Sequence, residues 1–310
     1  MTRPRIGIVG LGSMGEKHVK TCVEDRTDID VLGCTVGRRR MEYMMTKWGI
    51  PVVLDYRELV GKIDGVIVAV PTELHSEVAG WFLRHRIPVL VEKPIADTLE
   101  SARELVELAQ EHDTPLQVGH VERFNPAWRA ARRWWQDQVS GPPDRIEALR
   151  LSPPPQRDLG VGVILDMMIH DLDLILSILP EQPAIPWVET LTLDESKEED
   201  LCIARLQWPG AVASVTAARI AYRRVRQLKV SQGSITMKVD LLDPRVTVTR
   251  DGESWEELVV ESGWPLEYQL EEFLQVIAGG PCQVSGAEAL KSLELAYAIT
   301  EQGAKITKGN

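Results

Sequence analysis

The chain lacks an excess of basic residues, a long uninterrupted apolar run and a cluster of cysteines. Its formal net charge is -11 at pH 7, which argues against a nucleic-acid-binding protein because neutralising phosphates requires a basic face. The most apolar stretch, residues 164–179, is interrupted by acidic residues and falls short of the about 20 apolar residues that cross a bilayer. We therefore expect a protein that binds neither nucleic acid nor a membrane.

The four cysteines are far apart in the sequence, at Cys22, Cys34, Cys202 and Cys282. This spacing supplies neither the paired ligands of a zinc site nor the framework of a disulfide-rich domain. The first residues also lack the cleavage pattern of a secretory signal. We expect reduced thiols, no structural metal and a cytoplasmic location.

From Arg5 to about Gly119 short β-branched runs alternate with amphipathic stretches, which is typical of a parallel sheet covered by helices on both faces. After Arg123 a helix over 126–138 is followed by Pro-rich segments. Strands with period-two alternation come next, at 211–217, 227–230, 235–239 and 245–248, and helices over 266–278 and 287–305 close the chain. We predict an α/β domain with a doubly wound parallel sheet over 1–122. An α+β domain with a large, mostly antiparallel open sheet is predicted over 123–310.

A glycine-rich turn directly follows the first predicted strand and precedes a predicted helix. In this position glycines form a sharp turn, let a pyrophosphate approach the backbone and let the helix pack on the strand. A purely structural turn is the alternative. The predicted dinucleotide-binding residues are Gly10, Leu11, Gly12, Ser13, Met14 and Gly15.

The second strand ends without the carboxylate that bonds the adenosine ribose in NAD sites. Val36 stands near its end, and Arg38, Arg39 and Arg40 follow. Without an acid nothing repels a 2′-phosphate, and Arg38 and Arg39 can bind one through charge-assisted hydrogen bonds. The sequence favours NADP as cofactor, with NAD as the alternative. In the non-functional interpretation, the three arginines are simply solvent-exposed residues at the start of a surface helix.

Two further strands end in polar residues at the predicted carboxyl edge of the sheet, beside the nicotinamide end of a dinucleotide. Lys93 can hydrogen-bond a substrate oxygen there and stabilise negative charge that develops on it. A solvated surface lysine is the alternative. The residues expected to bind cofactor at this edge are Pro71, Thr72, His75, Glu92 and Lys93.

Asp166 and His170 lie four residues apart in an apolar stretch, so on a helix they share a face. Imidazole titrates near neutral pH and a neighbouring carboxylate can orient it, which makes a general base. A satisfied core pair or half of a metal site are the alternatives. The metal site is disfavoured because no other His or Cys cluster lies nearby in the sequence.

Four segments of the chain together resemble the glucose-fructose oxidoreductase and inositol dehydrogenase family, Gfo/Idh/MocA. They are the glycine-rich turn, the segment from Pro71-Thr72 to His75, the tripeptide Glu92-Lys93-Pro94 and the Asp166 to His170 segment. The resemblance covers essentially the whole chain. It implies an NAD(P)-dependent oxidoreductase with a Rossmann domain, and a second domain whose open sheet joins copies into a homodimer or homotetramer.

The resemblance also implies that Lys93, Asp166 and His170 form the catalytic group. His170 would take the proton from a sugar or cyclitol hydroxyl while a hydride passes to the nicotinamide. Lys93 would bond the same oxygen, and Asp166 would bond substrate or align the base. The Lys93-Pro94 peptide is a candidate for the cis form, which X-Pro bonds adopt at small cost.

Residues 118–126 look most like family members that oxidise the 3-hydroxyl of UDP-N-acetylhexosamines or their uronates. This resemblance implies that His120, Arg123 and Asn125 bind substrate, although Asn125 also has the pattern of a helix cap before Pro126. Arg150 and Arg157 flank a Pro-rich turn and are expected to meet a substrate diphosphate.

Three other functions remain open at this point. The substrate can be a free sugar, an inositol or another small polyol. The chain can be a cofactor-bound regulator without turnover, which the presence of Lys93, Asp166 and His170 argues against. It can also be an NAD-dependent glycosidase, which oxidises a sugar carbon only transiently.

Overall fold

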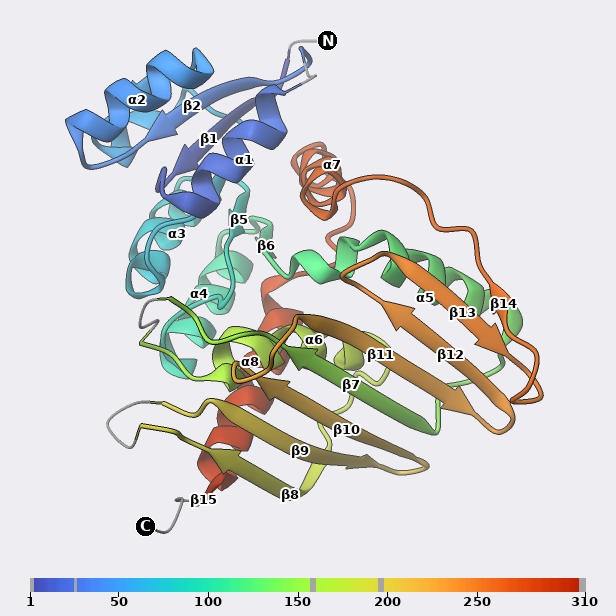
Figure 1. Cartoon of the computed structure of the whole chain (residues 1–310). Coiled ribbons are helices and arrows are strands. Elements are labelled where there is room, and N and C mark those ends of the chain that lie inside the picture. Colours follow the sequence, from blue (N-terminus) through green and yellow to red (C-terminus); the bar gives the residue numbers. More distant parts are fainter. Residues whose placement is uncertain (1–2, 25–26, 157–159, 195–197, 307–310) are drawn as a thin grey trace. The chain divides into compact units, whose positions relative to one another are not determined.

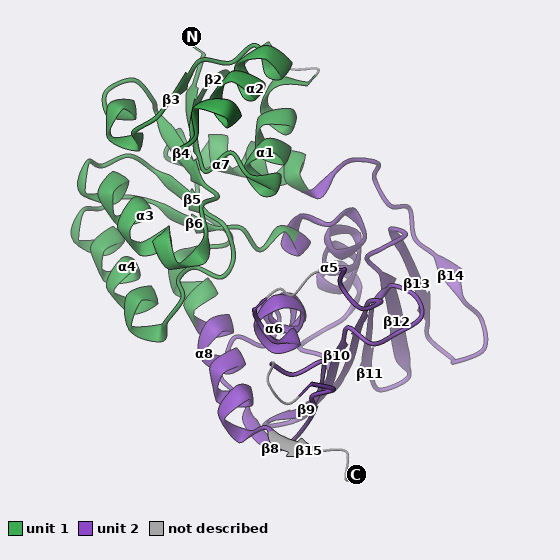
Figure 2. Ribbon diagram, turned by 60° about the vertical axis from the view of Figure 1, so that its left-hand side comes forward, with its two compact units in different colours: residues 1–121, 266–290 green, residues 122–265, 291–310 purple. Residues whose placement is uncertain are grey.

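The computed structural model describes residues 3–24, 27–156, 160–194 and 198–306. The chain forms two compact units, shown in different colours in Figure 2. Unit 1 consists of Met1–Val121 and Leu266–Leu290, and unit 2 consists of Glu122–Pro265 and Lys291–Asn310. None of the helices in the described part of the chain is long and apolar enough to cross a membrane.

Unit 1 contains a six-stranded sheet in the order β3-β2-β1-β4-β5-β6, and each neighbouring pair is parallel. The strand order reverses at β1, which lies between β2 and β4; ligands bind beyond the carboxyl ends of the strands at such a reversal. This confirms the predicted doubly wound sheet. The strands are β1 (Arg5–Val9), β2 (Asp30–Cys34), β3 (Val52–Val53), β4 (Gly65–Val68), β5 (Val89–Val91) and β6 (Leu116–Val118).

Helices connect these strands (Figure 1). Local capping explains two of their ends: the Thr98 side chain accepts a hydrogen bond from Ser101 N at the start of α4, and Gly49 ends α2 in the left-handed conformation. The helices are α1 (Ser13–Val23), α2 (Arg38–Trp48), η1 (Tyr56–Leu59), η2 (Thr72–Leu74), α3 (His75–Arg84) and α4 (Leu99–Glu111).

Helix α7 (Pro265–Ile277) lies almost entirely within unit 1, whereas the predicted second domain, 123–310, includes these residues. Leu270 and Phe273 are buried in the same apolar core as Ile6 and Ile67 of the six-stranded sheet. The amphipathic pattern of α7 identifies a helix with one apolar face, but it does not identify the sheet that this face covers. The predicted place of α7 in the second domain was therefore wrong.

Unit 2 contains a nine-stranded sheet in the order β14-β13-β12-β11-β7-β10-β9-β8-β15. Its pairs are antiparallel except β7 with β10 and β8 with β15, in agreement with the predicted, mostly antiparallel sheet. Strands β7, β8 and β9 were not predicted from the sequence. The strands are β7 (Arg145–Leu151), β8 (Ala184–Leu191), β9 (Leu201–Trp208), β10 (Ala211–Ala218), β11 (Val225–Gln232), β12 (Ile235–Asp240), β13 (Arg245–Thr249), β14 (Glu256–Glu257) and β15 (Ala304–Ile306).

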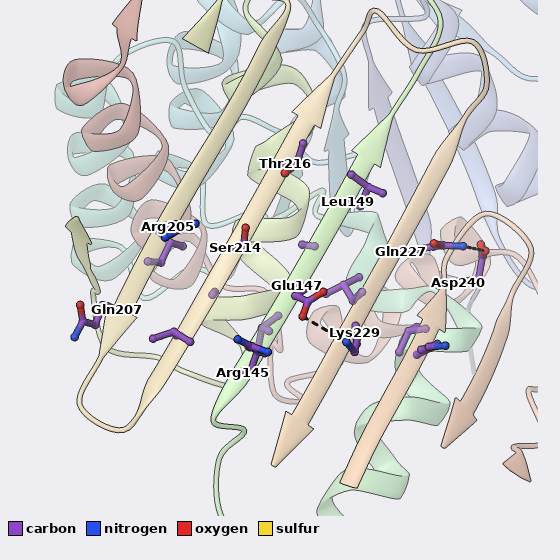
Figure 3. Close-up of a pocket in the computed structure, with 18 of the residues that line it drawn as sticks. Arg145, Glu147, Leu149, Arg205, Gln207, Ser214, Thr216, Gln227, Lys229 and Asp240 are labelled. Atoms are coloured by element: carbon purple, nitrogen blue, oxygen red, sulfur yellow. Dashed lines mark hydrogen bonds and ion pairs between the residues drawn. The ribbon is translucent and has the colours of Figure 1, made fainter. Parts of the chain in front are cut away.

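One face of this sheet is covered by helices and the other is open. Helix α5 (Pro126–Gln138) contacts β12 and β13, and α6 (Ile169–Leu176) contacts β7. On β7 the buried Ile146 and Ala148 alternate with the exposed Arg145 and Glu147, as expected for a strand with one buried face. Figure 3 shows the open face, which is hollowed over about 1520 Å³. Helix α8 (Gly286–Gln302) begins in unit 1 and ends in unit 2.

Candidate active site

Two glycines determine the shape of the glycine-rich turn after β1, and a third glycine faces open space. Gly10 has a φ of 91°, and a Cβ there would lie 2.5 Å from the carbonyl oxygen of Ala69. A Cβ on Gly15 would collide with the carbonyl oxygen of Gly10. At Gly12, by contrast, a Cβ would meet no described atom within 4 Å. The turn therefore packs against the end of β4 and faces open space at Gly12.

Helix α1 begins directly at this opening. Gly12 is its N-cap and provides no side-chain cap, so the first amides of the helix are not covered by a side chain. A hollow of about 740 Å³ lies beside them, lined by Gly12 and Ser13 among others. An open glycine at an uncapped helix start is the arrangement that accepts a pyrophosphate, so these residues fit a dinucleotide.

Arg40 holds this turn in place from α2. Its Nε donates to the carbonyl oxygen of Leu11 at 2.5 Å and its Nη2 donates to Glu16 Oε2 at 2.6 Å. Glu16 Oε1 also accepts from Lys47 Nζ at 2.8 Å and from Trp48 Nε1 at 3.3 Å. The hydrogen bond from Lys47, followed by those from Arg40 and Trp48, lowers the pKa of Glu16 to about 2 although burial opposes the shift.

The end of β2 lacks the carboxylate that bonds the adenosine ribose in NAD sites, as the sequence indicates. Val36 is 97% exposed, so no apolar packing explains its presence there. Arg38 and Arg39 open α2 and are both exposed. Within the described ranges neither of them forms an ion pair with a carboxylate, whereas the neighbouring Arg40 is engaged by Glu16.

At the end of β4 the imidazole of His75 bridges two strand ends. Its Nδ1 lies 2.9 Å from the carbonyl oxygen of Pro94 and its Nε2 lies 3.0 Å from that of Val70. The ring is buried, and burial lowers its pKa. Both ring nitrogens face backbone carbonyls, so His75 links the turn after β4 to the turn after Lys93. Its expected contact with cofactor stays a prediction.

The tripeptide after β5 is held by a second histidine. His18 Nε2, on α1, lies 2.6 Å from Glu92 Oε1. The Lys93-Pro94 peptide is cis, as predicted, and the Lys93 side chain is half-buried. Glu92 is thus linked to the helix that begins at the dinucleotide turn, and its predicted contact with cofactor stays a prediction, like those of Pro71, Thr72 and Lys93.

In unit 2, Asp166 lies on a π-helical turn, η4 (Ile164–Met168), that runs directly into α6. The backbone N–H of Ile169 donates to the carbonyl oxygen of Ile164, five residues back. Glu199 stabilises the start of the turn by accepting from Ile164 N at 3.0 Å. Asp166 and His170 are half-buried, so both are accessible at the surface of unit 2. π-Helical turns are often found at functional sites.

Arg123 and Asn125 have internal roles in the structure. The Arg123 Nε and Nη2 donate to the two carboxylate oxygens of Asp173 at 2.6 and 3.0 Å, and this ion pair is buried. Asn125 Oδ1 accepts from Ala127 N as the cap of α5, and its Nδ2 donates to Glu122 and to the carbonyl oxygen of Leu241. Both side chains are buried and bonded to protein groups, and their contact with substrate stays a prediction.

Arg150 is also internal. It donates from Nε and Nη2 to Asp171 at 2.8 and 2.9 Å and from Nη1 to Glu122 at 2.9 Å. These partners of Arg150 are all carboxylates of unit 2, and its expected contact with a diphosphate stays a prediction. His120 is buried as well, and its role stays a prediction. Arg157 lies outside the described residues.

Two features of unit 2 were not predicted from the sequence. Glu122 joins Arg150 to Arg226, which donates from Nη1 at 3.2 Å. The loop between β10 and β11 presents Tyr222, Arg223 and Arg224 to solvent. The run Tyr-Arg-Arg in a chain with an overall negative charge is the signal that indicates this loop.

Comparison with known proteins agrees with this geometry. Residues 4–120 match the family described as "Oxidoreductase family, NAD-binding Rossmann fold", and residues 128–236 match the GFO/IDH/MocA C-terminal domain. The chain is 27% identical over 256 residues to a UDP-N-acetylglucosamine 3-dehydrogenase of Acidithiobacillus ferrooxidans, covering 81% of this chain and 79% of that protein. A solved structure of that enzyme superposes with a TM-score of 0.88 at 25% identity and covers 98% of both chains.

An inositol 2-dehydrogenase of Corynebacterium glutamicum is 27% identical over 190 residues, which is 59% of this chain and 53% of that protein. The relatives thus include dehydrogenases that act on different sugar-type hydroxyls. Because the two family profiles together match more than half of the sequence, the chain belongs to the Gfo/Idh/MocA family of NAD-binding oxidoreductases.

Proposed function

We propose that this enzyme transfers a hydride between the C3 hydroxyl carbon of a UDP-N-acetylhexosamine and a nicotinamide cofactor. The observation that carries the proposal is the full-length likeness to the UDP-N-acetylglucosamine 3-dehydrogenase of Acidithiobacillus ferrooxidans, which extends beyond the cofactor domain. The accessible Asp166 and His170 at the start of α6 supply the acid and imidazole that such a reaction needs.

In the proposed reaction each catalytic side chain acts on the substrate hydroxyl. His170 accepts the hydroxyl proton as the C3–H bond breaks, and Asp166 orients the imidazole or bonds the substrate. Lys93 donates a hydrogen bond to the same oxygen and stabilises the negative charge that develops on it. When bound, the nicotinamide accepts the hydride. Gly12 and the first amides of α1 would hold the pyrophosphate of that cofactor.

A substrate panel tests this assignment. UDP-N-acetylglucosamine, free N-acetylglucosamine and myo-inositol are each offered with NADP or NAD, and cofactor reduction and product mass are followed. We expect UDP-N-acetylglucosamine to be oxidised to a product that has lost two hydrogen atoms. Preferential oxidation of inositol or the free sugar would contradict the substrate. Sugar release without net cofactor reduction would indicate a glycosidase, and cofactor binding without any turnover would indicate a regulator.

We further propose NADP as the preferred cofactor. Arg38 and Arg39 are exposed at the start of α2, and the exposed Val36 stands where an acid would repel a 2′-phosphate. Charge-assisted hydrogen bonds to that phosphate are expected to lower the KM for NADP below the KM for NAD by about tenfold or more. Steady-state kinetics with both cofactors measures this ratio, and a lower KM for NAD would contradict the proposal.

We also propose that the open face of the nine-stranded sheet joins copies of the chain into a homodimer or homotetramer. Val212 and Trp187 lie on this face with Arg205, whose guanidinium carbon is 5.6 Å from the centroid of the Trp187 ring. Figure 3 shows polar and charged side chains projecting from the same face. A Val212→Asp variant is expected to lower the mass measured by light scattering. An unchanged oligomeric mass would contradict this interface.

A further inference from the structure

The loop between β10 and β11, residues 219–224, presents an aromatic ring and two guanidiniums to solvent. Tyr222 is 88% exposed, and the guanidinium carbon of Arg223 lies 5.6 Å from the centroid of its ring. Arg223 and Arg224 are both exposed, and in the parts of the chain that the structure describes neither has a carboxylate partner. Arg219 anchors the loop by donating to the carbonyl oxygen of Val161.

Hydrogen bonds hold this loop beside the turn that carries Asp166. Ala221 N donates to the carbonyl oxygen of Ser152 at 3.0 Å. The hydroxyl of Ser152 lies 3.9 Å from the sulfur of Met167, which directly follows Asp166. The 219–224 loop joins the ends of β10 and β11 at the top of Figure 3. It therefore lies at the same end of the sheet as the π-helical turn that carries Asp166.

The loop adds positive charge to a cluster that is only partly neutralised. Arg226 donates to Glu122, which also accepts from Arg150, and Arg150 pairs with Asp171. Burial and the positive charges of Arg150 and Arg224 lower the pKa of Arg226, while Glu122 and Asp171 oppose this shift. Three guanidiniums thus face two carboxylates here.

The exposed Arg223, next to Arg224 in the chain, adds a further positive charge to the loop. The diphosphate of a nucleotide sugar carries two negative charges, and its oxygens match the forked donors of arginine. An exposed tyrosine ring beside them provides a surface on which a base stacks. The charge and shape of the loop therefore match one end of such a substrate.

We propose that the 219–224 loop binds the nucleoside diphosphate part of the substrate, with Arg223 and Arg224 on the diphosphate and Tyr222 against the base. The inference rests on the proposed function, because it applies only to a nucleotide-linked sugar. It assigns substrate binding to residues that stand apart from the reacting carbon, so their loss affects KM and leaves kcat largely unchanged.

The test compares Arg223→Gln/Arg224→Gln and Tyr222→Ala with the wild-type enzyme, using NADP and UDP-N-acetylglucosamine. We expect each variant to raise the KM for UDP-N-acetylglucosamine by about tenfold to a hundredfold, with kcat within about twofold of wild type. Calorimetric titration of the NADP-loaded enzyme with UDP alone should show a parallel rise in Kd. Tyr222→Phe keeps the ring and is expected to retain most of the affinity.

A matched control removes two exposed arginines of unit 2 that lie outside the loop. Arg133 lies on α5 and Arg250 follows β13. Arg133→Gln/Arg250→Gln should keep wild-type KM and Kd, which separates a local contact from a change in overall charge. An equal rise in KM for this control would overturn the assignment, as would a rise in KM for NADP alone in the loop variants.

Two outcomes distinguish failure of this inference from failure of the proposed function. If the wild-type enzyme oxidises UDP-N-acetylglucosamine and the folded loop variants keep its KM, only the role of the loop is refuted. If the wild-type enzyme neither binds UDP nor oxidises UDP-N-acetylglucosamine, the substrate assignment fails and the loop assignment fails with it. Circular dichroism and Tm of each variant establish that it is folded.

Discussion

His18 Nε2 lies 2.6 Å from Glu92 Oε1, and the side chains are only 3% and 12% exposed. The pair links α1, whose start faces the dinucleotide turn, to the tripeptide that contains Lys93. One buried contact thus connects the helix that follows the glycine-rich turn with the strand end that carries Lys93.

His18→Ala is expected to lower the free energy of unfolding by about 1–3 kcal/mol, because it leaves the carboxylate of Glu92 without this partner in a buried position. Urea denaturation measures the loss. His112→Ala, at the end of α4, serves as a control at a less buried histidine. Equal destabilisation by the two substitutions would contradict a specific contribution of the contact with Glu92 to the free energy of unfolding.

Arg123→Met is expected to cost about 3–5 kcal/mol, because it leaves the buried carboxylate of Asp173 without its bidentate partner. Adding Asp173→Asn to this variant removes the unpaired charge and should recover part of the loss. Chemical denaturation of the single and double variants provides the comparison. A double variant that is less stable than Arg123→Met would refute this explanation.

Lys93→Met and His170→Ala are each expected to lower kcat by about a hundredfold to ten-thousandfold, the usual contribution of a positioned acid or base. Binding of NADP, followed by quenching of tryptophan fluorescence, should stay near its wild-type strength. Turnover close to wild type in His170→Ala would remove this residue from the role of base.

Local sequence signals predicted the parts of the fold that are determined by neighbouring residues. Gly10 and Gly15 were expected from the turn they form. The parallel sheet followed from the Val-rich and Ile-rich runs that both of its faces bury. These features require only information that lies within a few residues of each position.

Features that depend on distant partners were not predictable in this way. Arg123 was expected to bind substrate from a family resemblance, and nothing near it in the sequence indicates Asp173, its partner 50 residues away. His75 shows the same limit, since its acceptors include the carbonyl oxygen of Pro94. An arginine or histidine looks the same in a sequence whether it binds a ligand or a buried protein group.

Val36→Asp is expected to shift the cofactor preference toward NAD. Val36 is almost fully exposed, so the substitution should change Tm little. A carboxylate there would repel a 2′-phosphate and bond a ribose hydroxyl, which should raise the KM for NADP by about tenfold. The ratio of kcat/KM for the two cofactors is the measurement, and an unchanged ratio would place the adenosine ribose elsewhere.

Glu16→Gln tests the cluster that holds the dinucleotide turn. Because the folded-state pKa of Glu16 is lowered to about 2, its carboxylate stabilises the fold above the unfolded-state pKa, and this contribution is lost as the pH falls toward 2. The Tm difference between wild type and Glu16→Gln should be largest near neutral pH and should shrink below about pH 4.5. A difference that stays constant down to pH 3 would contradict this assignment.

The position of α7 has a consequence for biosynthesis. Its Leu270 and Phe273 complete the core around Ile6 and Ile67, although more than 200 residues separate them in the sequence. While the ribosome is still making unit 2, the first part of the chain has left the exit tunnel without the helix that covers this core. A nascent chain that ends at residue 122 therefore exposes apolar surface to chaperones, and the unit becomes complete only after synthesis passes α7.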